Sequence, residues 1–176
     1  MIDADEHVTP ELSAEIQKTV KANDQSCAYA VPILPWCFGC FIRHGGWYPA
    51  AKVRLYPRSR ARYGDERVHE KLYFDEGVST KKLKGDLLHF TYRDMEHYLV
   101  KSAHYAAEWA EQRQADNRSV TLTQGFIHGL GCFLKMYLFK AGFLDGRQGL
   151  LLAILSAHST FVKYADLWSR NQPKAP

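Results

Sequence analysis

The sequence predicts a mixed α/β fold, with short strands and one helix in its front half and helices in its back half. Residues 1–92 alternate short apolar or β-branched segments with turn signals, whereas the segment from Tyr92 onward has helical spacing of apolar residues. The chain of 176 residues is long enough to bury a sizeable core. Its hydrophobic fraction of 46% and aromatic fraction of 13% are those of a folded protein.

The first predicted element is a helix that begins at Thr9-Pro10. Threonine is a good N-cap, proline fits the first helical position, and Glu11 stands at the positive end of the helix dipole. One apolar face follows at i, i+4 and i+8, and the helix is expected to stop near residues 22–24. The residues of that face are Leu12, Ile16 and Val20.

Strands are predicted next. Residues 27–43 are rich in aromatic and branched side chains but contain two prolines, which favours irregular or edge strands. Residues 52–56 alternate like a short strand, and so do the segments around 67–74 and 83–90. Gly45-Gly46 is a turn signal within this region.

The back half is predicted to contain three helices, over about 93–114, along an apolar stripe at 126–138, and over roughly 148–168. We therefore expect one region over 1–92 and a helical region over 93–170. Neither apolar helix is expected to span a membrane, because polar residues interrupt the first and the uninterrupted apolar run at 149–155 is far short of ~20 residues. Two interpretations stay open: a pair of core helices, or a pair that lies in a membrane interface.

Charge is distributed unevenly although the formal net charge is only +4. Residues 1–25 carry six acids against two lysines, while residues 40–84 carry eleven Lys or Arg against five acids. A basic middle next to an acidic start suits a phosphorylated or anionic partner. Nucleic acid is an alternative, but the sequence has no recognition motif for it, and we expect no nucleic-acid partner.

The four cysteines do not form a recognisable metal or disulfide pattern. Cys37 and Cys40 have the spacing of a thioredoxin active site, but the residues after them predict a strand and turn rather than the helix that such a site needs. A zinc site would need two more ligands, and only His44 is near. A thiol redox or zinc protein is kept as a third function, behind cysteines as small apolar strand residues.

Asp3-Ala4-Asp5-Glu6 is the most informative motif of the chain. Hard divalent cations prefer carboxylate oxygens, and Asp-x-Asp at the end of a short apolar strand places two of them near one point. Enzymes use such a pair to hold Mg²⁺ or Mn²⁺ against a diphosphate. The motif therefore predicts metal-assisted chemistry on a phosphorylated substrate.

Three further sites carry candidate chemistry. Glu70, which follows His69, is a candidate general base, although a Glu at such a place is more often a surface residue. His89 emerges from an apolar segment and suits a metal or phosphate, although a structural histidine is the commoner case. Trp47 and Tyr48 follow a glycine turn and offer aromatic faces to a sugar, or simply fill a core.

The order of these motifs resembles the family 2 glycosyltransferases of the GT-A fold, and most closely the bacterial lipopolysaccharide inner-core β-glycosyltransferases. The resemblance runs from Asp3 to about Trp168. The motifs that carry it are Asp-Ala-Asp-Glu with Thr-Pro-Glu-Leu, Gly-Gly-Trp-Tyr-Pro, Val-Arg-Leu-Tyr, Val-His-Glu, Leu-Leu-His-Phe-Thr-Tyr and Gly-Phe-Leu-Asp-Gly.

The resemblance implies an inverting transfer of a sugar from a nucleotide-sugar, expected to be a UDP-sugar, to lipopolysaccharide core or a related glycolipid. It implies a Mg or Mn ion and a place at the cytoplasmic face of the inner membrane, on its anionic surface. Glu70 matches the catalytic base, while Asp3, Asp5 and His89 match the metal site. Asp3 and Asp5 also match the residues on the ribose side of the donor, and the acceptor side is matched by Trp47, Tyr48 and His69.

One departure from the family pattern is expected to matter. In this family a Rossmann-like donor-binding half of roughly a hundred residues precedes the Asp-x-Asp motif, and this chain starts at the motif. The sequence is thus expected to be the C-terminal portion of a GT-A glycosyltransferase with a helical extension. The alternative function is a truncated, non-catalytic remnant or interaction module that needs a separate donor-binding half.

Overall fold

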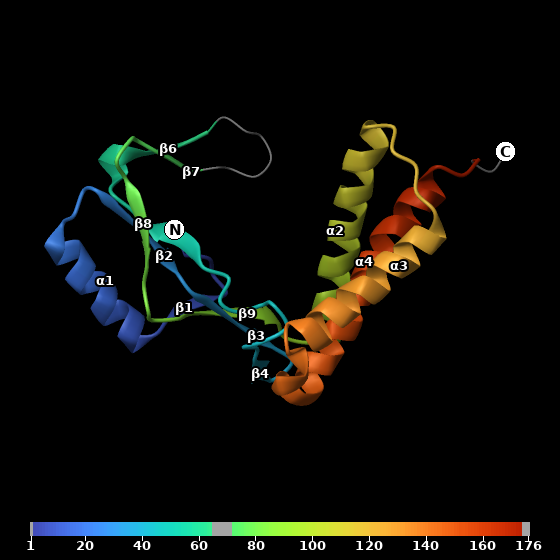
Figure 1. Cartoon of the computed structure of the whole chain (residues 1–176), viewed down its shortest axis with the longest axis horizontal. Coiled ribbons are helices and arrows are strands. Elements are labelled where there is room, and N and C mark those ends of the chain that lie inside the picture. Colours follow the sequence, from blue (N-terminus) through green and yellow to red (C-terminus); the bar gives the residue numbers. More distant parts are fainter. Residues whose placement is uncertain (1, 65–71, 174–176) are drawn as a thin grey trace. The chain divides into compact units, whose positions relative to one another are not determined.

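The computed structural model describes residues 2–64 and 72–173, and its packing divides the chain into two units. The first unit consists of Met1–Pro35 and Tyr48–Phe90, and it holds most of the strand residues of the described chain (Figure 1). The second consists of Trp36–Trp47 and Thr91–Pro176 and holds the long helices. The mixed α/β front and helical back predicted from the sequence are confirmed.

Helix α1 (Pro10–Ala22) begins and ends where the sequence predicts. The Thr9 side chain accepts a hydrogen bond from the Leu12 amide, Pro10 occupies the first turn, and Asn23 closes the helix in the left-handed conformation. Leu12 is buried against Val31 and Leu87 in the core of the first unit. The predicted apolar face is narrower than expected, since Val20 is 58% exposed.

The described residues form three small sheets. The first has the order β1 (Glu6–Val8), β9 (Leu87–Tyr92), β3 (Ile33–Cys37) and β4 (Cys40–Phe41). The second has β2 (Cys27–Val31) between β5 (Lys52–Leu55) and β8 (Ser79–Lys82), and β2–β8 is the parallel pair. The third pairs β6 (Ala61–Tyr63) with β7 (Leu72–Phe74), after the short 3₁₀ turn η1 (Arg58–Arg60). Strands β1, β6 and β8 lie outside the predicted strand segments.

The second unit contains α2 (Met95–Ala115), α3 (Leu122–Leu134), the π-helical turn η2 (Lys135–Phe139), the 3₁₀ turn η3 (Gly142–Asp145) and α4 (Gly146–Arg170). Helix α4 packs against both α2 and α3 (Figure 1). A cluster of Cys37, Ile42 and Leu152 forms a core, on which Trp47 and Tyr92 pack. This unit therefore joins the β3–β4 turn to the helices.

The apolar stripe of α3 and η2 is largely exposed. Phe126, Leu130 and Leu138 have exposed fractions of 64%, 49% and 51%, and Phe139 reaches 82%. Of the described residues, the stretch Gly142–Arg170 is long and apolar enough to cross a membrane by length and composition, and little of it is buried. The expectation that neither apolar helix spans a membrane stays a prediction. The two helices pack on each other, and Leu152, Ala153 and Leu167 of α4 are buried, whereas the apolar stripe of α3 and η2 is largely exposed. The two interpretations therefore stay open.

Candidate functional site

The acidic motif lies in a turn that leads into β1. The Glu6 amide donates a 3.0 Å hydrogen bond to the Asp3 carbonyl, so residues 3–6 form a tight turn. Asp3 and Asp5 precede β1 and Glu6 is its first residue, while the expectation that the motif follows the end of a strand stays a prediction. The turn nevertheless brings all three carboxylates to one edge of the sheet.

Glu6 is the buried anchor of this turn. Only 2% of its side chain is exposed, and its carboxylate accepts hydrogen bonds from the Asp3 amide at 3.0 Å and from Arg54 Nη2 at 2.6 Å. The same Arg54 nitrogen lies 3.3 Å from Asp3 Oδ2. Burying a carboxylate without a partner is costly, and the hydrogen bond from the Arg54 guanidinium offsets that cost for Glu6.

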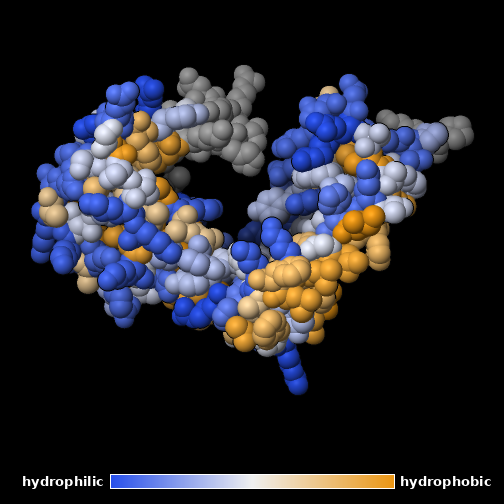
Figure 2. Space-filling model, viewed as in Figure 1, coloured by the Kyte–Doolittle hydropathy of each residue, from blue (hydrophilic) through white to orange (hydrophobic). Residues whose placement is uncertain are grey.

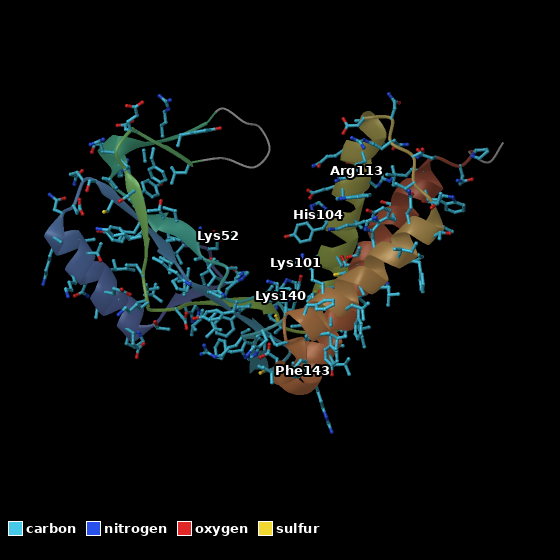
Figure 3. The ribbon with its side chains drawn as sticks, in the orientation of Figure 1. Lys52, Lys101, His104, Arg113, Lys140 and Phe143 are labelled. Carbon is cyan, nitrogen blue, oxygen red and sulfur yellow. The ribbon has the colours of Figure 1, made fainter. Side chains whose placement is uncertain are left out.

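Arg54 reaches the motif from a bulge in β5. Tyr29 pairs with Leu55 and Ala30 pairs with Val53, so Arg54 is the extra residue between two successive pairs. A bulge of this kind redirects a side chain out of the regular alternation of a strand. The exposed Lys52 lies on the same strand (Figure 3). The strand thus brings the Arg54 guanidinium to Asp3 and Glu6.

Asp5 and His89 form the second contact of the site. His89 stands in β9 opposite Glu6 of β1, and its Nε2 lies 3.3 Å from Asp5 Oδ2. The backbone fixes this approach, because the Phe90 amide donates to the Asp5 carbonyl at 2.9 Å. The side chains are 41% exposed for Asp5 and 28% exposed for His89, so both remain accessible to a ligand.

Asp3, Asp5 and His89 suit a cation that is bound jointly by the protein and a substrate. No group of three or more His, Cys, Asp or Glu within residues 2–64 and 72–173 is arranged to bind a metal ion by itself. Asp5 and His89 offer one oxygen and one nitrogen ligand, and Asp3 adds a carboxylate that Arg54 shares. Mg²⁺ is usually bound through one or two carboxylates, waters and substrate phosphates. An Asp5–His89 pair next to a diphosphate meets that pattern.

The two aromatic residues predicted for the acceptor side have different surroundings. Trp47 is half-buried in the second unit, with its ring 6.1 Å from that of Tyr92 in an edge-to-face contact. Tyr48 belongs to the first unit, where its hydroxyl donates a 2.9 Å hydrogen bond to Asp86. Both side chains therefore have structural contacts, and their role toward an acceptor stays a prediction.

Glu70 and His69 lie outside the described residues. They fall in the sequence between β6 and β7, two strands that pair antiparallel. The predicted base and its neighbour thus stay predictions.

The cysteines have the surroundings of structural thiols. All four are free, Cys27 and Cys37 are buried, and burial raises the pKa of the Cys37 thiol to about 12. A redox or metal-binding cysteine needs an easily formed thiolate, so Cys37 is unsuited to that chemistry. Cys37 faces Cys40 across the β3–β4 pair rather than at a helix start.

Sequence reasoning missed the two residues that hold the motif together, Glu6 and Arg54. Glu6 was visible as the third acid of the motif, but nothing in the sequence marked it as buried. Arg54 was visible in the alternating Lys-Val-Arg-Leu segment, which the sequence analysis used only as a strand signal. No local sequence signal marks Arg54, because its approach to the motif depends on the bulge in the pairing of β5 with β2.

Two curated proteins align with nearly the whole chain. The lipopolysaccharide core biosynthesis glycosyltransferase LpsC of Rhizobium meliloti (strain 1021) is 24% identical over 175 residues, which cover 99% of this chain and 64% of that protein. The uncharacterized glycosyltransferase RP128 of Rickettsia prowazekii (strain Madrid E) is 25% identical over 182 aligned positions, which cover 94% of this chain and 60% of that protein. No family model and no solved structure matches the chain.

These alignments establish distant homology to glycosyltransferases, one of which acts in lipopolysaccharide core biosynthesis. The chain spans about three fifths of the length of these curated relatives. Nearly the whole chain is therefore homologous to part of these glycosyltransferases.

Proposed function

We propose that the chain takes part in metal-dependent, inverting sugar transfer from a nucleotide-sugar, expected to be a UDP-sugar, to lipopolysaccharide core or a related glycolipid. The single observation that carries this proposal is the alignment of nearly the entire chain with two glycosyltransferases. The proposed fold is the GT-A fold of family 2, of which this chain would supply the metal and acceptor portion. The proposed place of action is the cytoplasmic face of the inner membrane.

The contacts of the acidic turn support a role in holding the donor diphosphate. A bound Mg²⁺ or Mn²⁺ would stabilise the charge of the leaving nucleotide diphosphate. Asp5 and His89 would hold that ion, and Asp3 would share it or contact the ribose side of the donor. Arg54 keeps Asp3 and Glu6 fixed, so the carboxylates are already oriented before the donor arrives.

Glu70 is the proposed base. A carboxylate that takes the proton of the acceptor hydroxyl lets that oxygen attack the sugar from the face opposite the leaving diphosphate. Attack from the opposite face inverts the configuration and needs no covalent sugar–protein intermediate. Trp47, Tyr48 and His69 are the proposed acceptor contacts.

Gene deletion with complementation tests the proposal in the natural setting. Deleting the coding gene should shorten the lipopolysaccharide core by one sugar, and the wild-type gene should restore it, as read by mass spectrometry of the purified glycolipid. Glu70→Gln should fail to restore it, since loss of a general base costs about 10²–10⁴-fold in rate.

Glu76→Gln is the matched control, because Glu76 is an exposed acid that follows β7 in the sequence. This variant should restore the core fully. An unchanged core in the deletion strain would reject the proposed function and favour a non-catalytic module. Restoration by Glu70→Gln would instead remove Glu70 from the mechanism.

A further inference from the structure

Helices α3 and α4 with the turns between them form a hairpin that exposes its apolar side chains. Their exposed fractions reach 60% at Ile127, 82% at Phe139 and 60% at Leu144. Hydrophobic residues gather over the turns η2 and η3, where Phe143 lies (Figures 2 and 3). We call residues 135–145 the hairpin tip. Large contiguous apolar surfaces of this kind mark interaction sites in soluble proteins.

Two glycines of α3 let α4 approach closely, and Phe161 and Tyr164 of α4 pack at this contact. A Cβ placed on Gly125 would lie 2.7 Å from the Tyr164 Cβ, and one on Gly129 would lie 3.0 Å from the Ala157 carbonyl oxygen. The two glycines form a Gly-x-x-x-Gly spacing, which lets helix backbones approach closely and is common between helices in membranes. The contact is centred on the glycines, and the side chains of Phe126, Ile127 and Leu130 stay largely exposed.

Among the Asp, Glu, Lys and Arg side chains of the hairpin, those that are exposed are all cationic. Asp145 is the only Asp or Glu between residues 117 and 165, and its side chain is just 6% exposed. It accepts hydrogen bonds from the backbone amides of Arg43 and His44 and lies 2.8 Å from His44 Nδ1. The exposed charges at the tip are therefore cationic: Lys135, Lys140 and the adjoining Arg147.

We propose that the hairpin tip inserts into one leaflet of an anionic lipid bilayer. Apolar side chains gain free energy by leaving water, and lysine and arginine beside them are attracted to anionic headgroups. An anionic bilayer matches both features, because its headgroups attract the exposed Lys135, Lys140 and Arg147 and its acyl region accepts the apolar side chains. The inference goes beyond the proposed activity, because it rests on the surface of the hairpin alone.

Vesicle flotation tests the proposal with the whole chain. We expect binding to vesicles of phosphatidylcholine with phosphatidylglycerol, and much weaker binding to phosphatidylcholine alone. Neutralising Lys140 and Arg147 to Gln should lower the partition coefficient to anionic vesicles by about fivefold per cation. Phe139→Asp should lower the partition coefficient by at least about tenfold. The substitution removes the apolar ring that would enter the bilayer and adds a negative charge that the anionic headgroups repel.

Matched variants separate these effects from general ones. Val100→Asp changes another exposed apolar residue, which lies on α2 and has an exposed fraction of 66%. Lys21→Gln neutralises an exposed cation of α1. Both variants should bind like the wild type. Phe139→Trp reports insertion directly, because brominated lipids should quench its fluorescence beyond the quenching of the native tryptophans. Phe139 is so exposed that its variants should fold, and circular dichroism of each variant checks this.

Three outcomes would overturn the proposal. One is a chain that stays unbound in the presence of anionic vesicles, and another is binding that Phe139→Asp leaves unchanged. The third is a dimer, seen by sedimentation equilibrium, that Phe139→Asp dissolves while lipid binding is absent, which would assign the tip to a second copy of the chain. None of these results depends on sugar transfer, so the two proposals fail separately.

Discussion

The buried carboxylate of Glu6 accepts a 2.6 Å hydrogen bond from Nη2 of Arg54, which projects from the bulge of β5. This pair ties the acidic turn to the second sheet of the first unit. The exposed Asp3 contacts the same nitrogen at 3.3 Å. One guanidinium thus contacts one buried and one exposed carboxylate. The Glu6–Arg54 and Asp3–Arg54 contacts should differ in their contribution to stability.

Glu6→Gln should lower the free energy of unfolding by about 1–3 kcal/mol, because it leaves the Arg54 charge without its buried partner. Asp3→Asn should change it by no more than about 0.5 kcal/mol, since an exposed ion pair contributes little. Urea denaturation followed by circular dichroism measures both. Equal effects of the two substitutions would contradict the assignment of Glu6 as the anchor.

Asp5→Asn should weaken the binding of Mn²⁺ and nucleotide diphosphate together, by roughly tenfold or more, because it removes the charge of a cation ligand. Electron paramagnetic resonance of Mn²⁺, titrated with the chain in the presence of UDP, reports the free ion. Asp75→Asn is the matched control, since Asp75 is an exposed acid paired with Arg60 away from the turn. Unchanged Mn²⁺ affinity in Asp5→Asn would make the motif structural.

Local signals predicted the fold well where one residue type has a strong backbone preference. Thr9, Pro10 and Asn23 set the ends of α1 through their own caps, so the sequence suffices for them. The bulge at Arg54 was not predictable, because it depends on the pairing of β5 with β2, two strands distant in sequence. The strand order likewise depends on packing that no local pattern records.

The site was predicted in part for the same reason. The sequence identified Asp5 and His89 separately, and the antiparallel pairing of β1 with β9 is what brings them within 3.3 Å. The apolar stripe at 126–138 was found by its period, but a period does not tell which side faces a partner. The structure shows that the side with Gly125 and Gly129 contacts α4.

Cys37 should react with iodoacetamide far more slowly than Cys40 in the folded chain. The pKa of about 12 leaves roughly 10³-fold less thiolate at Cys37 than the usual value for a thiol, and the side chain is buried. Reactivity should rise as the pH rises toward that pKa, because the thiolate is the nucleophile. Mass spectrometry of peptides after timed alkylation checks this, with urea as the control in which both thiols react alike. Rapid alkylation of Cys37 at pH 8 would restore the redox alternative.

Gly125→Ala and Gly131→Ala, two identical changes in α3, should shift stability in opposite directions. A Cβ at Gly125 would lie 2.7 Å from the Tyr164 Cβ, so the helices must separate, which costs about 1–3 kcal/mol. A Cβ at Gly131 would have no heavy atom within 4 Å, so alanine there should gain about 0.5–1 kcal/mol from helix propensity alone. Thermal unfolding followed by circular dichroism compares the two variants with the wild type. A melting temperature lowered by Gly125→Ala and raised by Gly131→Ala supports a close α3–α4 contact, and a gain from both would show that the hairpin is held by its apolar side chains instead.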